Sequence, residues 1–199
     1  MQKALSIFLL LTLSYTALIG QGQTEKWQKK ATQLVEKSNF RKADRYLKKI
    51  LLQEDYHPDA HFLKAKVHQH FEEYEEAFEH LESAMALLPD EGSYQIGMGN
   101  LKYTLGLKQL KTVESCDCGK YIIPEHNGTL TATDFFKSAL KNYNRSLELL
   151  PNIGETYFQL GMTHYALGNT LASCTAIKKA KELNYKMAEQ VNNANCPNE

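Results

Sequence analysis

The chain has 199 residues, and its 23 Lys and Arg balance its 23 Asp and Glu, so the formal net charge at pH 7 is zero. A neutral chain has no overall electrostatic attraction to nucleic acid or to an anionic membrane, and neither is expected as a partner. The length is sufficient for one compact domain with a sizeable core.

The N-terminus has the layout of a signal peptide, predicted over residues 1–22. Lys3 gives a basic start, residues 4–19 are mainly apolar, and small residues follow at Gly20 and Gly22. This layout predicts cleavage after Gly22 or Gly20, and export to the periplasm or to the cell surface and exterior. An uncleaved membrane anchor is the alternative, although the apolar run is short for a span of roughly 20 residues.

The rest of the chain, residues 23–199, is expected to form one domain built on an internal repeat. Phe40 precedes Ala43 by three residues and Tyr74 precedes Ala77 in the same way, and the two alanines are 34 residues apart. Small residues at fixed positions allow paired helices to approach closely. Prolines fall where a helix ends or a new one begins, at Pro58, Pro89 and Pro151.

This period resembles the tetratricopeptide-repeat (TPR) family, in which each unit is a pair of antiparallel helices. The residues that carry the resemblance include Trp27, Ala31 and Ala43 in a first unit, Ala65, Ala77, Ala84 and Pro89 in a second, and Tyr157, Gly161, Gly168 and Ala180 in the last. The resemblance implies an all-α helix-turn-helix solenoid. Its four units are expected over about 24–57, 58–91, 92–153 and 154–187, with a C-terminal capping helix over 186–195.

The third unit is expected to be interrupted. Gly99 and Gly106 fit a unit that begins at residue 92, whereas Phe136 and Ala139 fit one that begins at residue 120, so 28 residues are inserted between its two helices. The insertion is predicted over 107–131, and Thr131 or Thr133 could cap the helix that follows. Loops of this length in compact domains are usually functional or disordered, and the cysteines and apolar residues of this one favour order.

The four cysteines of an exported chain are expected to form disulfides. Two antiparallel helices that turn near residue 185 would place Cys174 opposite Cys196, which would join the cap to the last repeat. Cys116 and Cys118 then remain as a structural Cys-x-Cys disulfide. A redox-active pair and a metal site with His126 are the alternatives.

The TPR resemblance also implies a partner-binding surface, because the family usually binds partners in a concave groove lined by the first helix of each unit. The matching residues are Phe62, Lys66, Gln69, His70, Ile96, Asn100, Tyr103, Phe158, Met162 and Tyr165. This set is neutral and aromatic, which favours an apolar or helical protein segment. The alternative is that the insertion folds back and fills the groove with Ile122 and Ile123. His61 and His68 fall at packing positions of the repeat and are expected in the core.

We therefore expect an exported TPR scaffold that binds a protein or peptide, in a bacterial envelope or secretion assembly. A thiol–disulfide redox protein that uses Cys116 and Cys118 is the alternative, and a structural subunit that stacks on itself is a third hypothesis. The sequence has no nucleophile motif, phosphate loop or metal-binding helix motif. Enzyme activity, a cofactor, a metal ion and a small-molecule substrate are therefore not expected, and a membrane is expected only through association.

Overall fold

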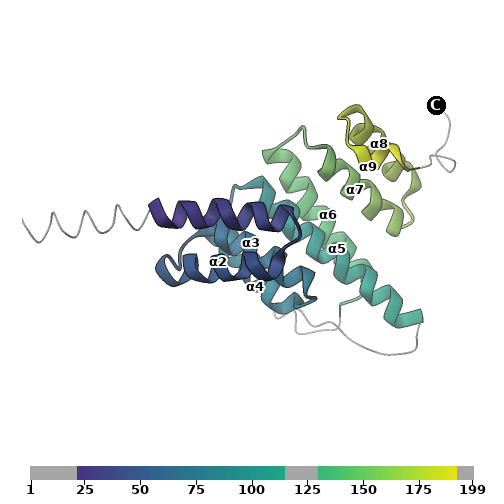
Figure 1. Ribbon diagram of the computed structural model, residues 1–199. Helices are drawn as coiled ribbons and strands as arrows, with labels where there is room; N and C mark the ends of the chain where they lie inside the picture. Colours follow the sequence, from purple (N-terminus) through teal and green to yellow (C-terminus); the bar gives the residue numbers. More distant parts are fainter. Residues whose placement is uncertain (1–21, 115–129, 192–199) are drawn as a thin grey trace, which may run out of the picture. The chain divides into compact units, whose positions relative to one another are not determined.

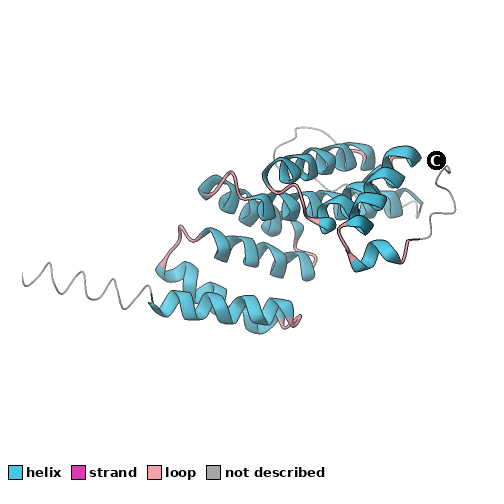
Figure 2. Ribbon diagram, turned by 90° about the horizontal axis from the view of Figure 1, so that it is seen from above, coloured by secondary structure: helices cyan, strands magenta, loops and turns pink. Residues whose placement is uncertain are grey.

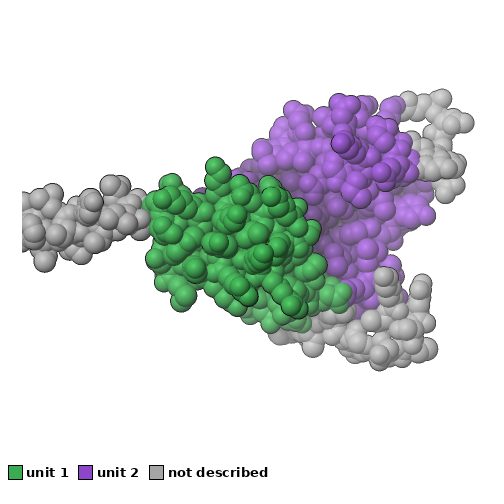
Figure 3. All heavy atoms as spheres, viewed as in Figure 1, with its two compact units in different colours: residues 1–87 green, residues 88–199 purple. Residues whose placement is uncertain are grey.

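The computed structural model describes residues 22–114 and 130–191, and all regular structure within these ranges is α-helical (Figure 2). The chain forms two compact units, residues 1–87 and 88–199 (Figure 3). Repeat proteins divide in this way because each helix pair contacts mainly its sequence neighbours. No helix of the described ranges combines the length and the apolar character that a bilayer span needs.

The first unit consists of a helix over 22–36, α2 (Phe40–Gln53), α3 (Pro58–His70) and α4 (Tyr74–Leu87) (Figure 1). The helices begin where the local sequence favours it, since Pro58 occupies the first turn of α3 and the His57 ring accepts a hydrogen bond from the Ala60 N–H at 3.3 Å. The core of the unit is formed by Ala31, Ala43, Leu47, Ile50, Ala60, Leu63 and Val67. Small residues in this core let the helices approach closely, as the repeat pattern predicts.

The second unit consists of α5 (Gly92–Glu114), α6 (Ala132–Leu149), α7 (Gly154–Ala166), α8 (Thr170–Glu182) and the single turn α9 (Lys186–Glu189). Gly168, with φ of 75°, lies in the left-handed conformation that ends α7. Phe158, Ile177, Ala180 and Ala188 form the core of its C-terminal part.

Helix α5 is longer than predicted, which corrects the start of the insertion over 107–131. The helix continues to Glu114, because Gly106 does not end it. A Cβ on Gly106 would lie 2.6 Å from Cε1 of Phe136, so this glycine is needed for close packing against α6. The following helix begins as predicted, with Thr131 and Asp134 in a reciprocal capping box. Residues 115–129, including most of the predicted insertion, lie outside the described residues.

The capping helix is shorter than the predicted 186–195. Of residues 186–191, which the structure describes, Lys186–Glu189 are helical, and the backbone turns at Gln190 and bends at Val191. One turn is sufficient to bury Ala188 and to pack Val191 on the same apolar cluster. The Lys181 ammonium group donates to the Val191 carbonyl oxygen at 3.2 Å, which holds the end of this segment beside α8.

Candidate functional site

The exposed face of α3 carries the four predicted groove residues of the first unit. Phe62 and Gln69 are half-buried, whereas Lys66 and His70 are exposed. The Lys66 ammonium lies 4.5 Å from the centre of the Phe62 ring, which is the geometry of a cation–π interaction. His70 turns away toward α2 and stacks on Phe40, with ring centroids 4.0 Å apart. The face therefore offers an aromatic ring, one cation and an amide to solvent.

The predicted groove residues of α5 are more strongly engaged inside their own unit. Ile96 is buried. Asn100 Oδ1 accepts a hydrogen bond of 2.8 Å from the hydroxyl of the buried Tyr143 on α6. Tyr103 is half-buried, its ring centroid is 5.6 Å from that of Phe136, and burial raises its pKa. These three side chains contribute to the packing of α5 as well as to any surface.

Of the three predicted groove residues of α7, only Tyr165 is well exposed, at 61%. Phe158 is buried, and its ring lies 5.4 Å from that of Tyr185, next to α9. Met162 packs against the same apolar cluster. The prediction of Phe158 as a contact residue does not fit this arrangement, because its ring belongs to the core that the C-terminal cap covers.

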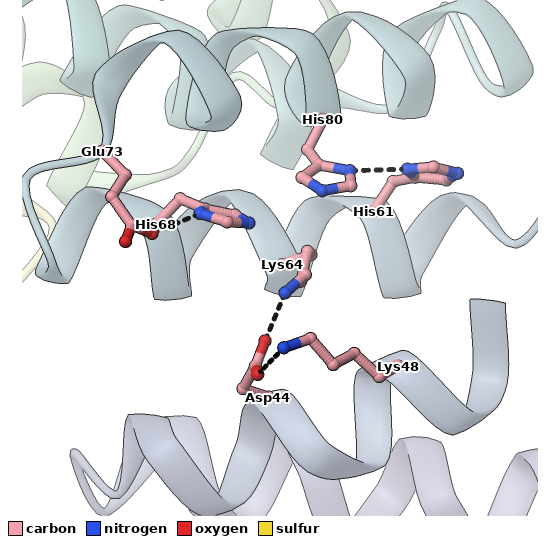
Figure 4. A network of polar contacts seen from close by, with 7 residues as sticks. All are labelled: Asp44, Lys48, His61, Lys64, His68, Glu73 and His80. Atoms are coloured by element: carbon pink, nitrogen blue, oxygen red, sulfur yellow. Dashed lines mark hydrogen bonds and ion pairs between the residues drawn. The ribbon is translucent and has the colours of Figure 1, made fainter. Parts of the chain in front are cut away.

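Unit 1 also contains a histidine network that sequence reasoning identified only in part (Figure 4). His61 and His68 of α3 both face His80 of α4, a residue that the repeat pattern does not single out. The Nδ1 atoms of His61 and His80 are 2.9 Å apart, and the rings of His68 and His80 are stacked at 5.2 Å. His61 Nε2 lies 2.8 Å from the Asp55 carbonyl oxygen, which can only accept. His61 Nε2 therefore donates, and His61 Nδ1 accepts from His80.

Charged groups from α2, from α3 and from the turn before α4 surround this network. His68 Nδ1 lies 2.6 Å from Glu73 Oε2. The buried Lys64 ammonium pairs with Asp44 of α2, which also accepts from Lys48 at 2.8 Å. Burial acts to raise the pKa of Asp44, but the hydrogen bonds and charges of the two lysines outweigh it and hold this pKa below its usual range.

The pKa of His80 is lowered to about 4, chiefly by burial and further by the positive charges that His61, His68 and Lys64 carry when protonated. The ring is therefore neutral near pH 7. Within residues 22–114 and 130–191, no group of three or more His, Cys, Asp or Glu is arranged to hold a metal ion. The network serves to join α2, α3 and α4 behind the exposed face of α3.

Comparison with known proteins identifies the repeat. A family model described as tetratricopeptide repeat matches residues 154–187, the range predicted for the fourth unit. A crystal structure of a thermophilic TPR protein from Thermus thermophilus superposes with a TM-score of 0.65 at 14% identity, covering 80% of this chain and 74% of that one. Residues 154–187 are therefore a tetratricopeptide repeat, and the chain as a whole has the TPR fold. No curated protein matches its sequence.

Two other solved structures share the fold of this TPR protein. A crystal structure of MamA has a TM-score of 0.58 at 16% identity, covering 83% of this chain and 75% of that one. A chain of the crystal structure of the APC/C hetero-tetramer Cut9–Hcn1 has a TM-score of 0.59 at 14% identity, covering 82% of this chain but 28% of that one. At these identities the likeness establishes the TPR fold, and the fold class predicted from the sequence is confirmed.

The cysteines of this TPR protein lie mainly outside the described residues. Cys174, half-buried on α8, is disulfide-bonded. Its possible partners within the chain, Cys116, Cys118 and Cys196, all lie outside the described ranges, and so does His126. The pairing of Cys174 with Cys196 and the redox hypothesis for Cys116 and Cys118 stay predictions.

Proposed function

We propose that this TPR protein is an exported, non-enzymatic scaffold that binds a protein or peptide segment within a bacterial envelope or secretion assembly. The TPR fold supports a protein partner, since TPR proteins typically mediate protein–protein interaction. One of the structures that share the fold is a chain of the APC/C hetero-tetramer Cut9–Hcn1. The predicted signal peptide is the support for export. No cofactor or small-molecule substrate is part of the proposal.

One observation carries the proposed contact surface, namely the exposed face of α3. Lys66 covers the half-buried Phe62 ring at 4.5 Å, and Gln69 lies one turn further along. None of these side chains belongs to the core cluster of unit 1. A partner that displaces water from this face gains apolar contact with the ring and hydrogen bonds to the amide. The partner that fits is an apolar or amphipathic segment with few charges.

In unit 2, the corresponding surface is reduced to Tyr165 at the end of α7. Its ring is exposed, whereas Phe158 and Met162 of the same helix pack inward. An exposed tyrosine is a frequent anchor in protein interfaces, because it combines a large apolar ring with one hydroxyl group. The competing occupant, Ile122 and Ile123 of the insertion, lies outside the described residues.

Site-specific photocrosslinking in the native cell tests the contact surface. A photoreactive residue in place of Gln69 or of Tyr165 should give a discrete crosslinked adduct with one partner. The matched control is Lys137, an exposed position on α6, which is the second helix of its pair and should give no such adduct. An identical adduct from position 137, or none from either test position, would contradict the assignment. A crosslink within the chain, from either test position to residues 115–129, would show that the insertion occupies the surface.

A further inference from the structure

The zero net charge of the chain hides a strong separation of charge within unit 1. Residues 22–53, here called the basic hairpin, contain nine Lys and Arg against three Asp and Glu, a net charge of +6. Residues 54–87 contain two Lys against nine Asp and Glu, a net charge of −7. The expectation that the chain has no electrostatic attraction to an anionic surface holds for the whole chain but not for this hairpin.

The cations of α2 share one exposed face. Arg41, Arg45, Lys48 and Leu52 follow at intervals of four, three and four residues, so their side chains leave the helix on the same side. All four are exposed, and Lys42 and Lys49 flank them. The opposite face of the helix is buried through Ala43, Leu47 and Ile50. Core packing therefore leaves this cationic face open to solvent.

The helix over 22–36 repeats the pattern. Lys26 and Lys30, four residues apart, lie on one side of it, Lys29 is beside them, and Lys37 follows the last residue of the helix. The other side packs into the core through Ala31. The Lys49 ammonium group of α2 lies 5.6 Å from the centroid of the Trp27 ring of this helix, and Lys49 is exposed.

Two large apolar side chains lie in solvent at the end of the hairpin. Leu52, on the cationic face itself, is 86% exposed, and Tyr56 is 82% exposed. A nucleic acid would use the cations but has no general use for an exposed leucine beside them. A phospholipid surface uses both, because its phosphates attract Lys and Arg while its interface accepts Leu and Tyr.

We propose that the basic hairpin docks on an anionic phospholipid surface, with its Lys and Arg side chains against the phosphates and with Leu52 and Tyr56 inserted among the headgroups. The carboxylates of α3 and α4 would be repelled by the same surface, which favours one orientation of unit 1. The proposed protein contact on α3 does not depend on this docking, and the two can be tested separately.

Vesicle flotation tests the proposal, using the mature chain from Gln23 onward, which contains every described helix. We compare vesicles of phosphatidylcholine alone with vesicles that also contain phosphatidylglycerol. The mature chain should float only with the anionic vesicles, and added salt should weaken this binding. The variant Arg41→Gln/Lys42→Gln/Arg45→Gln should lower the partition coefficient by about fivefold per removed cation, or about 100-fold in all. These side chains are exposed, and none has a contact that the fold requires.

The control variant Lys137→Gln/Lys141→Gln/Lys186→Gln removes three exposed cations from unit 2 and should bind as the wild type does. Leu52→Ser/Tyr56→Ser should weaken binding at all salt concentrations. Equal losses in the test and control variants would show non-specific attraction and overturn the proposal. It is equally overturned if wild-type binding does not require phosphatidylglycerol, or if the Leu52 and Tyr56 substitutions have no effect. Salt-sensitive dimers in sedimentation velocity, without vesicle binding, would assign the hairpin to a second copy of this chain.

Discussion

At the scale of single residues, Gly99 controls how closely α5 and α6 approach. A Cβ at this position would lie 2.5 Å from Cε1 of Tyr143, whose ring is fully buried and whose hydroxyl is bound to Asn100. The ring cannot move away without losing that hydrogen bond. Overpacking costs about 1–3 kcal/mol, whereas the higher helix propensity of alanine offsets about 1 kcal/mol. We expect Gly99→Ala to lower the free energy of unfolding by about 1 kcal/mol, measured by urea denaturation.

The same substitution in a Tyr143→Leu background separates this steric effect from other causes. With the ring removed, the alanine has room and its better helix propensity should dominate. Gly99→Ala should then be neutral or slightly stabilising. An equal loss in both backgrounds would show that contact with Tyr143 is not the reason for the glycine.

His80 should make unit 1 sensitive to acid. Its pKa is about 4 in the folded protein against 6.5 for an unperturbed histidine, so the unfolded chain takes up a proton first as the pH falls. The free energy of unfolding should therefore decrease between about pH 6.5 and about pH 4. Allowing for the partial solvent exposure of the ring, we expect a loss of about 1–2 kcal/mol. Urea denaturation followed near pH 7 and near pH 5 measures it.

The variant His80→Phe keeps an aromatic ring but removes the proton site. Its free energy of unfolding should change less than that of the wild type between the two pH values. Above about pH 7.5, the difference in the free energy of unfolding between the two proteins should stay constant. The pKa of His164 in unit 2 is also lowered by burial, so part of the pH dependence should remain in both proteins. Identical pH profiles for wild type and variant would contradict the role given to His80.

Sequence spacing predicted single residues well where packing within one helix pair decides their place. Ala31, Ala43 and Ala77 are fully buried at the small-residue positions of the repeat. The contact between His61 and His80 was not predictable in this way, because it depends on the rotamers of two residues on different helices. The burial of Phe158 was not predictable for a similar reason, since it depends on Tyr185 at the end of the repeat, whose ring lies 5.4 Å away.

At the scale of elements, two side chains cap the start of α6. The Thr131 hydroxyl accepts a hydrogen bond from the Asp134 N–H at 3.3 Å, and Asp134 Oδ2 accepts from the Thr131 N–H at 2.9 Å. Loss of such a cap typically costs about 1 kcal/mol. Thr131→Ala should therefore lower the stability of the protein by about that amount in thermal or urea denaturation. The control Thr133→Ala lies inside the helix on an exposed face, and an equal loss there would contradict the capping role.

The C-terminal cap should be joined to α8 by a disulfide. Cys174 is disulfide-bonded, and Lys181 contacts the Val191 carbonyl, so the chain after Tyr185 runs back along α8. When two antiparallel segments turn near residue 185, the numbers of two residues that face each other add up to about 370. The numbers 174 and 196 do so, which favours Cys196 as the partner of Cys174. Peptide mapping without reduction should find this pair. The chain-entropy model gives a loss of about 3 kcal/mol for Cys196→Ser. A Cys174 peptide linked to Cys116 or Cys118 would contradict the pairing.

The lengths of α5 and α9 show where element prediction from sequence stops. Gly106 has the spacing of a helix-ending glycine, yet its place opposite Phe136 makes it a packing glycine, and only the partner helix distinguishes the two roles. The prolines predict helix ends with less ambiguity than the glycines. A proline lacks the backbone N–H that the interior of a helix needs, and this effect does not depend on a partner helix. Pro58 begins α3, and Pro89 and Pro151 follow the ends of α4 and α6.

At the scale of the whole molecule, the all-α repeat fold followed from the sequence because every helix pair packs on residues close to it in the chain. The division into two units did not follow, and neither did the importance of local charge. The positive and negative residues were all visible, but their total of zero concealed a hairpin of +6 beside a segment of −7. In a repeat protein each repeat contacts mainly its neighbours along the chain. The net charge of each repeat is therefore a better guide to its partners than the net charge of the whole chain.

The export prediction concerns the molecule as a whole, because it decides where every surface acts. If residues 1–22 are a signal peptide, the mature protein should begin at Gln23, or at Gln21 if cleavage follows Gly20. Intact-mass measurement of the protein from its native cell distinguishes these forms. Leu10→Arg, which places a charge in the apolar run, should block processing and leave the full-length chain in the cell. A wild-type chain that keeps residues 1–22 and sediments with membranes would establish the anchor instead. In that case the basic hairpin would follow directly after a membrane-bound segment.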